Sequence, residues 1–127
     1  MNKAIQNWLQ IAEYDLETAK AMLKGKRYLY VAFMCQQAIE KLLKAIYSKQ
    51  KKESAPRVHN LIYLSEFLEL ELSNEDKEFL SNLNQFYIGS RYPTEQSKLA
   101  QSIDENATTE YLKRTEEIFQ CLKKALL

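Results

Sequence analysis

Arg91 is the residue of this chain whose type and position best suit the binding of an anion. It lies in the run Arg-Tyr-Pro, with Tyr92 after it and Tyr87 four residues before it. A guanidinium can hold a phosphate or a carboxylate through two parallel hydrogen bonds. Tyrosine rings can stack on a nucleotide base or on the guanidinium itself. We therefore treat these three residues as candidate ligand-binding residues. The alternative is that Arg91 pairs with an acidic residue such as Glu40 and fixes its loop.

A second group of candidates follows from a polar stripe inside an apolar segment. Gln37, Glu40 and Lys44 are spaced by three and four residues, so they share one face of a helix. One interpretation is a solvated face, on which a Glu40–Lys44 pair contributes only about 0.2–0.5 kcal/mol. The other is that this stripe forms a wall of a binding groove, which would add the three residues to the ligand-binding set.

Other catalytic or metal-binding arrangements are missing from the sequence. There is no glycine-rich phosphate loop, no His-Glu-x-x-His and no Glu-x-x-His pair. His59 is the only histidine, and its simplest role is at a helix start, bonded to a backbone group. Cys35 and Cys121 fall on apolar helix positions and are predicted to be buried thiols. We expect neither a metal nor a cofactor.

Length and charge limit the classes of partner. The 127 residues suit one domain, spanning 1–127, and 18 basic against 17 acidic residues leave a net charge of +1. Such a balance argues against binding to DNA through bulk charge. The charges are segregated, however: residues 41–57 carry a local +5 and residues 66–78 a local −5. These blocks are either solvated faces or surfaces for docking between subunits or with a partner.

The sequence also bears on localisation. The opening residues, MNKAIQNWLQ, lack the apolar region of a signal peptide. No apolar run approaches the length of about 18 residues that spans a membrane. We expect a cytoplasmic protein without a membrane partner.

The elements that must position the candidates are all helical. Two glycines and two prolines are few, and neither strand alternation nor a hairpin turn is present. Apolar residues at helical spacing predict a first helix over residues 3–24 and a central helix over 28–47, both antiparallel across Gly25. Further helices are predicted from residue 58 or 59 to 72, from 73 to 87, and from 106 or 108 onward. Residues 89–106 are expected to be irregular, with Gly89 as a left-handed cap and Pro93 preventing a new helix.

Four short motifs then connect these helices to a known family. In chain order they are Ala12-x-x-Asp15-Leu16-x-x-Ala19, Phe33-x-x-Gln36-Gln37-Ala38-x-Glu40-Lys41-x-x-Lys44-Ala45, His59-x-Leu61-x-x-Leu64 and Tyr87-x-x-x-Arg91-Tyr92-Pro93. Together they resemble the HEPN domain, an all-α module found beside minimal nucleotidyltransferases and in several ribonucleases. The resemblance implies an up-and-down four-helix bundle with an extra short helix. It also implies a homodimer with Arg-Tyr-Pro at or near the dimer groove.

The resemblance carries a function as well. It implies a nucleotide- or RNA-associated binding protein whose partner is a separate small nucleotidyltransferase, in a module of the toxin–antitoxin type. The ribonuclease centre of the family is an arginine followed, after four to six residues, by a histidine. Here Gln96, Ser97 and Lys98 stand at those offsets from Arg91, so we expect no ribonuclease activity. Two alternatives stay open: a metal-independent ribonuclease that has replaced the histidine, and an interaction module without a ligand.

Overall fold

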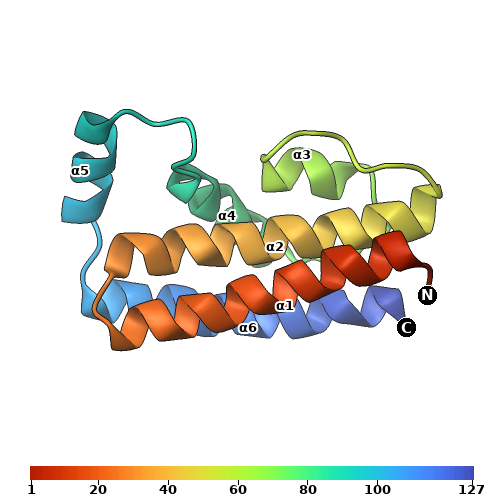
Figure 1. Ribbon diagram of the computed structural model, residues 1–127, viewed down its shortest axis with the longest axis horizontal. Helices are drawn as coiled ribbons and strands as arrows, with labels where there is room; N and C mark the ends of the chain where they lie inside the picture. Colours follow the sequence, from red (N-terminus) through yellow and green to blue (C-terminus); the bar gives the residue numbers. More distant parts are fainter.

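The computed structural model describes residues 1–127 and is entirely helical between its loops (Figure 1), which confirms the predicted fold class. Two short 3-10 helices accompany six α-helices. The α-helices are α1 (Lys3–Lys24), α2 (Tyr28–Lys51), α3 (Leu61–Glu66), α4 (Asn74–Leu83), α5 (Pro93–Gln101) and α6 (Glu105–Lys123). The 3-10 helices are η1 (Asn84–Phe86) and η2 (Lys124–Leu126).

Four of these helices make the bundle, and successive members run in alternating directions: α1, α2, α4 and α6 (Figure 1). The first helix begins where predicted, because the side chain of Asn2 accepts a hydrogen bond from the Ile5 amide. It ends at Gly25, but the left-handed residue of the turn is Lys26, with φ at 59°. Three residues therefore suffice to reverse the chain into α2, as predicted.

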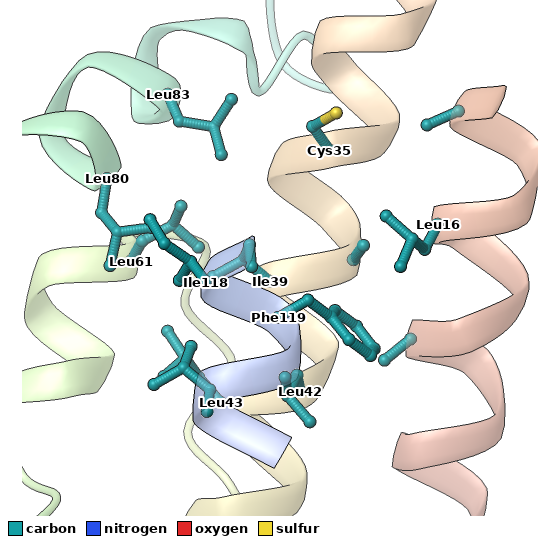
Figure 2. Packing of buried hydrophobic residues seen from close by; sticks show 14 of the residues in the cluster. Leu16, Cys35, Ile39, Leu42, Leu43, Leu61, Leu80, Leu83, Ile118 and Phe119 are labelled. Carbon is teal, nitrogen blue, oxygen red and sulfur yellow. The ribbon is translucent and has the colours of Figure 1, made fainter. Parts of the chain in front are cut away.

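The central helix α2 contacts every other part of the bundle. Its buried residues are aliphatic on the sides that face α1, α6 and α4, and Figure 2 shows Ile39 and Leu42 among side chains of those helices. Phe119 of α6 and Leu16 of α1 meet α2 within one continuous apolar cluster. The thiol of Cys35 lies inside this cluster, where burial raises its pKa to about 12. Cys121 is exposed, so the prediction of two buried thiols was wrong for that residue.

The segments between α2 and α6 depart from the predicted helix boundaries. Helix α3 covers six residues only, and α4 passes into η1 at Asn84, so that Tyr87 lies beyond the helix. Residues 89–106, which we expected to be irregular, contain the nine-residue helix α5. Pro93 occupies the first turn of α5, where its missing N–H and fixed φ are favourable, so it starts a helix instead of preventing one.

The structure also bears on membrane insertion. None of the helices combines the length and the apolar character that crossing a bilayer requires.

Candidate functional site

Two of the three residues of the polar stripe of α2, Glu40 and Lys44, are buried, so the interpretation as a solvated face was wrong for them. Glu40 is fully excluded from solvent and Lys44 is 5% exposed. The carboxylate oxygen Oε2 of Glu40 accepts hydrogen bonds from Lys41 Nζ at 3.0 Å and from Lys44 Nζ at 3.1 Å. The other oxygen, Oε1, accepts from Gln36 Nε2 at 3.3 Å. Spacings of four along α2 bring Gln36, Glu40 and Lys44 onto one line, as the helical repeat requires.

His59 completes this network from outside α2. Its Nδ1 lies 3.0 Å from Oε1 of Glu40 and 3.1 Å from Oε2. Burial alone would raise the pKa of the Glu40 carboxyl, but Lys41 and Lys44 outweigh burial and hold this pKa below its ordinary value. Glu40 is therefore ionised and accepts only, so Nδ1 of His59 carries a proton and donates it. In the neutral ring this leaves the lone pair on Nε2 free for other chemistry.

Amide side chains hold the backbone around His59. Gln36 Nε2 donates to the His59 carbonyl oxygen at 2.8 Å, which ties the segment before α3 to α2. Asn60 caps α3 by accepting hydrogen bonds from the amides of Ile62 and Tyr63. Asn84 accepts from the Leu61 amide at 2.8 Å and donates to Asn60 Oδ1 at 3.1 Å. The start of α3 and the end of α4 are thus fixed to each other.

Tyr87 forms one wall beside the histidine. Its ring stacks on the imidazole of His59, with centroids 4.1 Å apart and planes 12° apart, and it also meets Phe33 at 6.0 Å. Gly89 makes this position accessible, because a Cβ there would lie 2.6 Å from the Tyr87 hydroxyl. The glycine is needed for this close approach and not for a left-handed cap, since neither glycine has a positive φ.

Arg91, in the loop before α5, lies near the hollow that His59 and Tyr87 line. Its Nη1 donates to Oε2 of Glu95 at 3.2 Å, across one turn at the start of α5. Its Nε is buried and has no hydrogen-bond partner. The loop itself is held by Gln96, whose Nε2 donates to the Arg91 carbonyl oxygen at 3.2 Å. Arg91 therefore does pair with a carboxylate, as the alternative interpretation proposed, but with Glu95 and not with Glu40.

These residues line a polar hollow of about 330 Å³ that opens to solvent between the start of α3, the end of α4 and α5. Its lining residues are His59, Asn60, Asn84, Tyr87, Ser90, Arg91 and Glu95. One cation, one titratable ring and several hydrogen-bonding side chains face a space large enough for a small anionic group. Four Cys, His or carboxylate ligands do not gather there, and no cluster of three such residues that could hold a metal occurs in the molecule.

The six candidate ligand-binding residues are not all in one place. Arg91 and Tyr87 line the hollow, while Glu40 lies behind it and supports His59. Tyr92 is 76% exposed and does not line the hollow. Lys44 lines a different cavity, between the start of α1 and the end of α2.

Gln37 is half-buried on α2 and lines none of the principal cavities. Sequence analysis missed the contribution of His59, Asn60, Asn84 and Glu95. Three signals were present in the sequence: the motif that begins with His59, the helix-capping potential of Asn60, and the spacing of four between Arg91 and Glu95. The contacts of His59 with Glu40 and of Asn84 with Asn60 depend on how the chain folds back on α2.

The fold and the site define this protein as an all-α bundle in which a buried Glu40–Lys44 pair supports the partly exposed His59 at the edge of a polar hollow. The family model of the HEPN domain matches residues 5–125, so the chain belongs to the HEPN domain family.

Two solved structures share the fold. TT1696 from Thermus thermophilus superposes with a TM-score of 0.81 at 23% identity, covering 98% of this chain and 99% of that one. ST0689, described as an archaeal HEPN homologue, gives a TM-score of 0.76 at 23% identity with both chains covered completely. Among curated proteins, no sequence matches this chain.

Proposed function

We propose that the hollow binds a phosphate group of a nucleotide or of RNA, with Arg91 as its anchor. The observation that supports this proposal is the incomplete hydrogen bonding of the Arg91 guanidinium. Arg91 offers five N–H donors, of which Glu95 engages Nη1, while the buried Nε has no partner. Buried donors are almost always satisfied in folded proteins. A phosphate that displaced Glu95 would supply the missing acceptors and suit the planar fork of arginine.

The surroundings of Arg91 favour a nucleotide over a simple anion. Tyr87 is already stacked on His59, so one face of its ring is occupied. Tyr92 is exposed beside Arg91 and leaves its ring available for a base. Asn60 and Asn84 add amide groups to the lining, which can bond to sugar or base edges.

The assembly that we propose follows from the family resemblance and from the charge pattern. We infer a homodimer that works with a separate minimal nucleotidyltransferase in a module of the toxin–antitoxin type. Residues 41–57 and 66–78 carry opposite charge, and their exposed members, such as Lys51 and Glu75, are available for docking between subunits or with that partner, whereas Lys41 and Lys44 pair with Glu40. Light scattering at tens of micromolar should give the mass of a dimer, and a monomer would contradict this part. A nucleotidyltransferase encoded next to this chain should copurify with it.

Isothermal titration against a panel of nucleotides tests the anchor. Arg91→Lys keeps the charge but removes the fork, so it should weaken binding by about 1.5–3 kcal/mol, or roughly tenfold to over a hundredfold. Arg114→Lys is the matched control, because Arg114 also pairs with one carboxylate, Asp76 at 3.1 Å, and is similarly exposed. Equal affinities for wild type and Arg91→Lys would contradict the proposal.

The position of His59 favours a second candidate, a metal-independent ribonuclease. His59 lines the same hollow as Arg91, and Glu40 fixes its Nδ1 as the protonated nitrogen. Its Nε2 could take the proton of a ribose 2′-hydroxyl, whose oxygen then attacks the phosphorus. The 5′-oxygen would leave and take a proton from solvent, giving a 2′,3′-cyclic phosphate, while Arg91 stabilises the developing charge.

Incubation of purified protein with labelled RNA separates the two candidates. The binding proposal expects the RNA to stay intact. Cleavage that survives exhaustive purification and disappears in both Arg91→Ala and His59→Gln would establish the ribonuclease instead. Arg114→Ala again serves as the control, since a contaminating nuclease would be unaffected by all three substitutions.

A further inference from the structure

The start of α1 and the end of α2 lie at the same end of the bundle (Figure 1). Residues of both helix ends line a second and larger cavity there. Its volume is about 830 Å³, within the usual range of small-ligand sites. The first turn of α1, the last turns of α2 and residues 52–57 form its walls, and it shares no lining residue with the hollow around Arg91.

The lining of this cavity is strongly basic. Four cationic side chains, Lys44, Lys49, Lys52 and Arg57, face one acidic side chain, Glu53. Glu53 accepts a hydrogen bond from the Tyr47 hydroxyl at 2.8 Å. Four of the six basic residues of the segment 41–57 are therefore gathered around one concave surface, where low-dielectric walls strengthen their field.

The four cations differ in how far the protein satisfies them. Lys44 donates to Glu40, and Lys49 donates to the main-chain oxygens of Ala125 and Leu127 at 3.3 and 3.0 Å. Lys52 and Arg57 take part in none of the ion pairs of the molecule. Lys52 and Arg57 are thus free to bind a ligand, whereas Lys44 and Lys49 are already hydrogen-bonded within the protein.

An aromatic wall completes the cavity. Trp8 lines it, and the ammonium groups of Lys41 and Lys44 lie 5.8 and 5.5 Å from the centre of its ring. These contacts fix the indole in place. Basic residues combined with an aromatic ring are the usual means of holding phosphates next to bases.

We propose that this cavity is a second, independent phosphate-binding site, in which Lys52 and Arg57 hold the phosphates of a nucleotide or of an RNA strand beside Trp8. A nucleotide and an RNA strand present the same phosphate groups, but the strand is longer. Arg57 lines this cavity, and His59, two residues later, lines the hollow around Arg91. An RNA strand could therefore occupy both cavities, whereas a mononucleotide would fill one.

Trp8 is the only tryptophan of the chain, so its fluorescence reports directly on this cavity. Inorganic pyrophosphate and a short oligouridylate are titrated separately at matched ionic strength, because exposed charges are screened by salt. We expect both probes to change the emission of Trp8 in wild type. We expect Lys52→Gln with Arg57→Gln to weaken both by about tenfold or more, the effect of losing charged hydrogen bonds.

The matched control is the pair Lys26→Gln and Arg27→Gln. It removes the same two charges at the α1–α2 turn, at the opposite end of the bundle (Figure 1), and Lys26 shares the positive φ of Lys52. The control should bind both probes like wild type. Equal weakening in the two double variants would overturn the proposal, and so would unchanged Trp8 emission with both probes in wild type.

Arg91→Lys separates this site from the hollow and identifies the ligand source. If the affinity for pyrophosphate, measured by Trp8 emission, falls in Arg91→Lys, then the Trp8 signal depends on the hollow. This result would overturn the proposal of an independent second site. If pyrophosphate is unaffected while oligouridylate weakens, a strand spans both cavities. If both probes bind Arg91→Lys as they bind wild type, both occupy the second site without using the hollow. For a strand, the slope of log affinity against log salt should also fall by about 1.4 when Lys52 and Arg57 are replaced.

Discussion

Glu40 contacts His59, and Arg91 lines the same hollow as His59, but the protein satisfies these two charges to very different degrees. Both oxygens of Glu40 accept hydrogen bonds, from Gln36, Lys41, Lys44 and His59. Arg91 has one carboxylate partner and a buried nitrogen without any. A saturated charge contributes to the fold and to the orientation of its neighbours, while an unsaturated charge beside a hollow is available to a ligand. Substitutions at Glu40 should therefore affect stability, and substitutions at Arg91 should affect binding.

The largest effect should follow from Glu40→Ala. Removal of the carboxylate leaves the buried Lys44 without its partner, and breaking a buried ion pair costs about 3–5 kcal/mol. The free energy of unfolding is measured by urea titration. Glu110→Ala, on the exposed surface of α6, is the control and should stay within about 0.5 kcal/mol. A small loss for Glu40→Ala would show that water satisfies the network and that the contrast with Arg91 is overstated.

Leu42→Ala provides the apolar reference on the same helix. Leu42 is fully buried in the core, and truncation of such a leucine costs about 2–5 kcal/mol. The exposed Lys51 supplies the control, and Lys51→Ala should change the urea midpoint little. Lys41 is unsuitable for that purpose, because it pairs with Glu40 at 3.0 Å.

The pH dependence of stability should distinguish two buried carboxyls. The pKa of Glu40 is lowered, so its contribution is present above the ordinary value of 4.5 and is lost as pH falls through the folded-state pKa. Burial raises the pKa of Asp15 above 3.8, so wild type loses stability as pH rises through its folded-state pKa. The free energy of unfolding of Glu40→Gln should therefore approach that of wild type at acidic pH. That of Asp15→Asn should increase relative to wild type as pH rises. Parallel profiles for the two variants would contradict these signs.

Arg91→Ala should affect stability far less than either core substitution. The Arg91–Glu95 pair is partly exposed, and such pairs contribute about 0–1 kcal/mol. The urea midpoint should therefore fall slightly while ligand binding is lost. A loss of stability as large as that of Leu42→Ala, without any effect on a ligand, would assign Arg91 to the fold alone.

The sequence was sufficient for the fold where local rules decide the structure. Helical spacing of apolar residues located α1 and α2. Helix α4 begins beside residue 73, the predicted start, where Ser73 forms a capping box with Asp76. The sequence failed at α5, where Pro93 was interpreted as a break. A proline serves equally well at the first turn of a new helix, and its sequence neighbours alone did not distinguish the two roles.

The site was less accessible to sequence reasoning. Arg91 and Tyr87 were identified by chemical type and spacing, and both line the hollow. The burial of Glu40 was not foreseen, because a Glu–Lys pair at helical spacing is typical of surfaces. His59 was placed in another helix from Arg91 and given no part in its site. Its position depends on the return of the chain along α2, which brings residues 40 and 59 together.

The most direct test of the central claim is the affinity of a Glu95→Gln variant for the nucleotide that binds wild type best. Glu95 competes with an incoming phosphate for Arg91. Its neutralisation should therefore tighten binding, by up to about fivefold for a pair of this exposure. Glu110→Gln makes the same charge change on α6, away from the hollow, and should leave the affinity unchanged. Tighter binding for Glu95→Gln alone is the predicted result in isothermal titration; weaker binding for Glu95→Gln would contradict the assignment of Arg91 as the phosphate anchor.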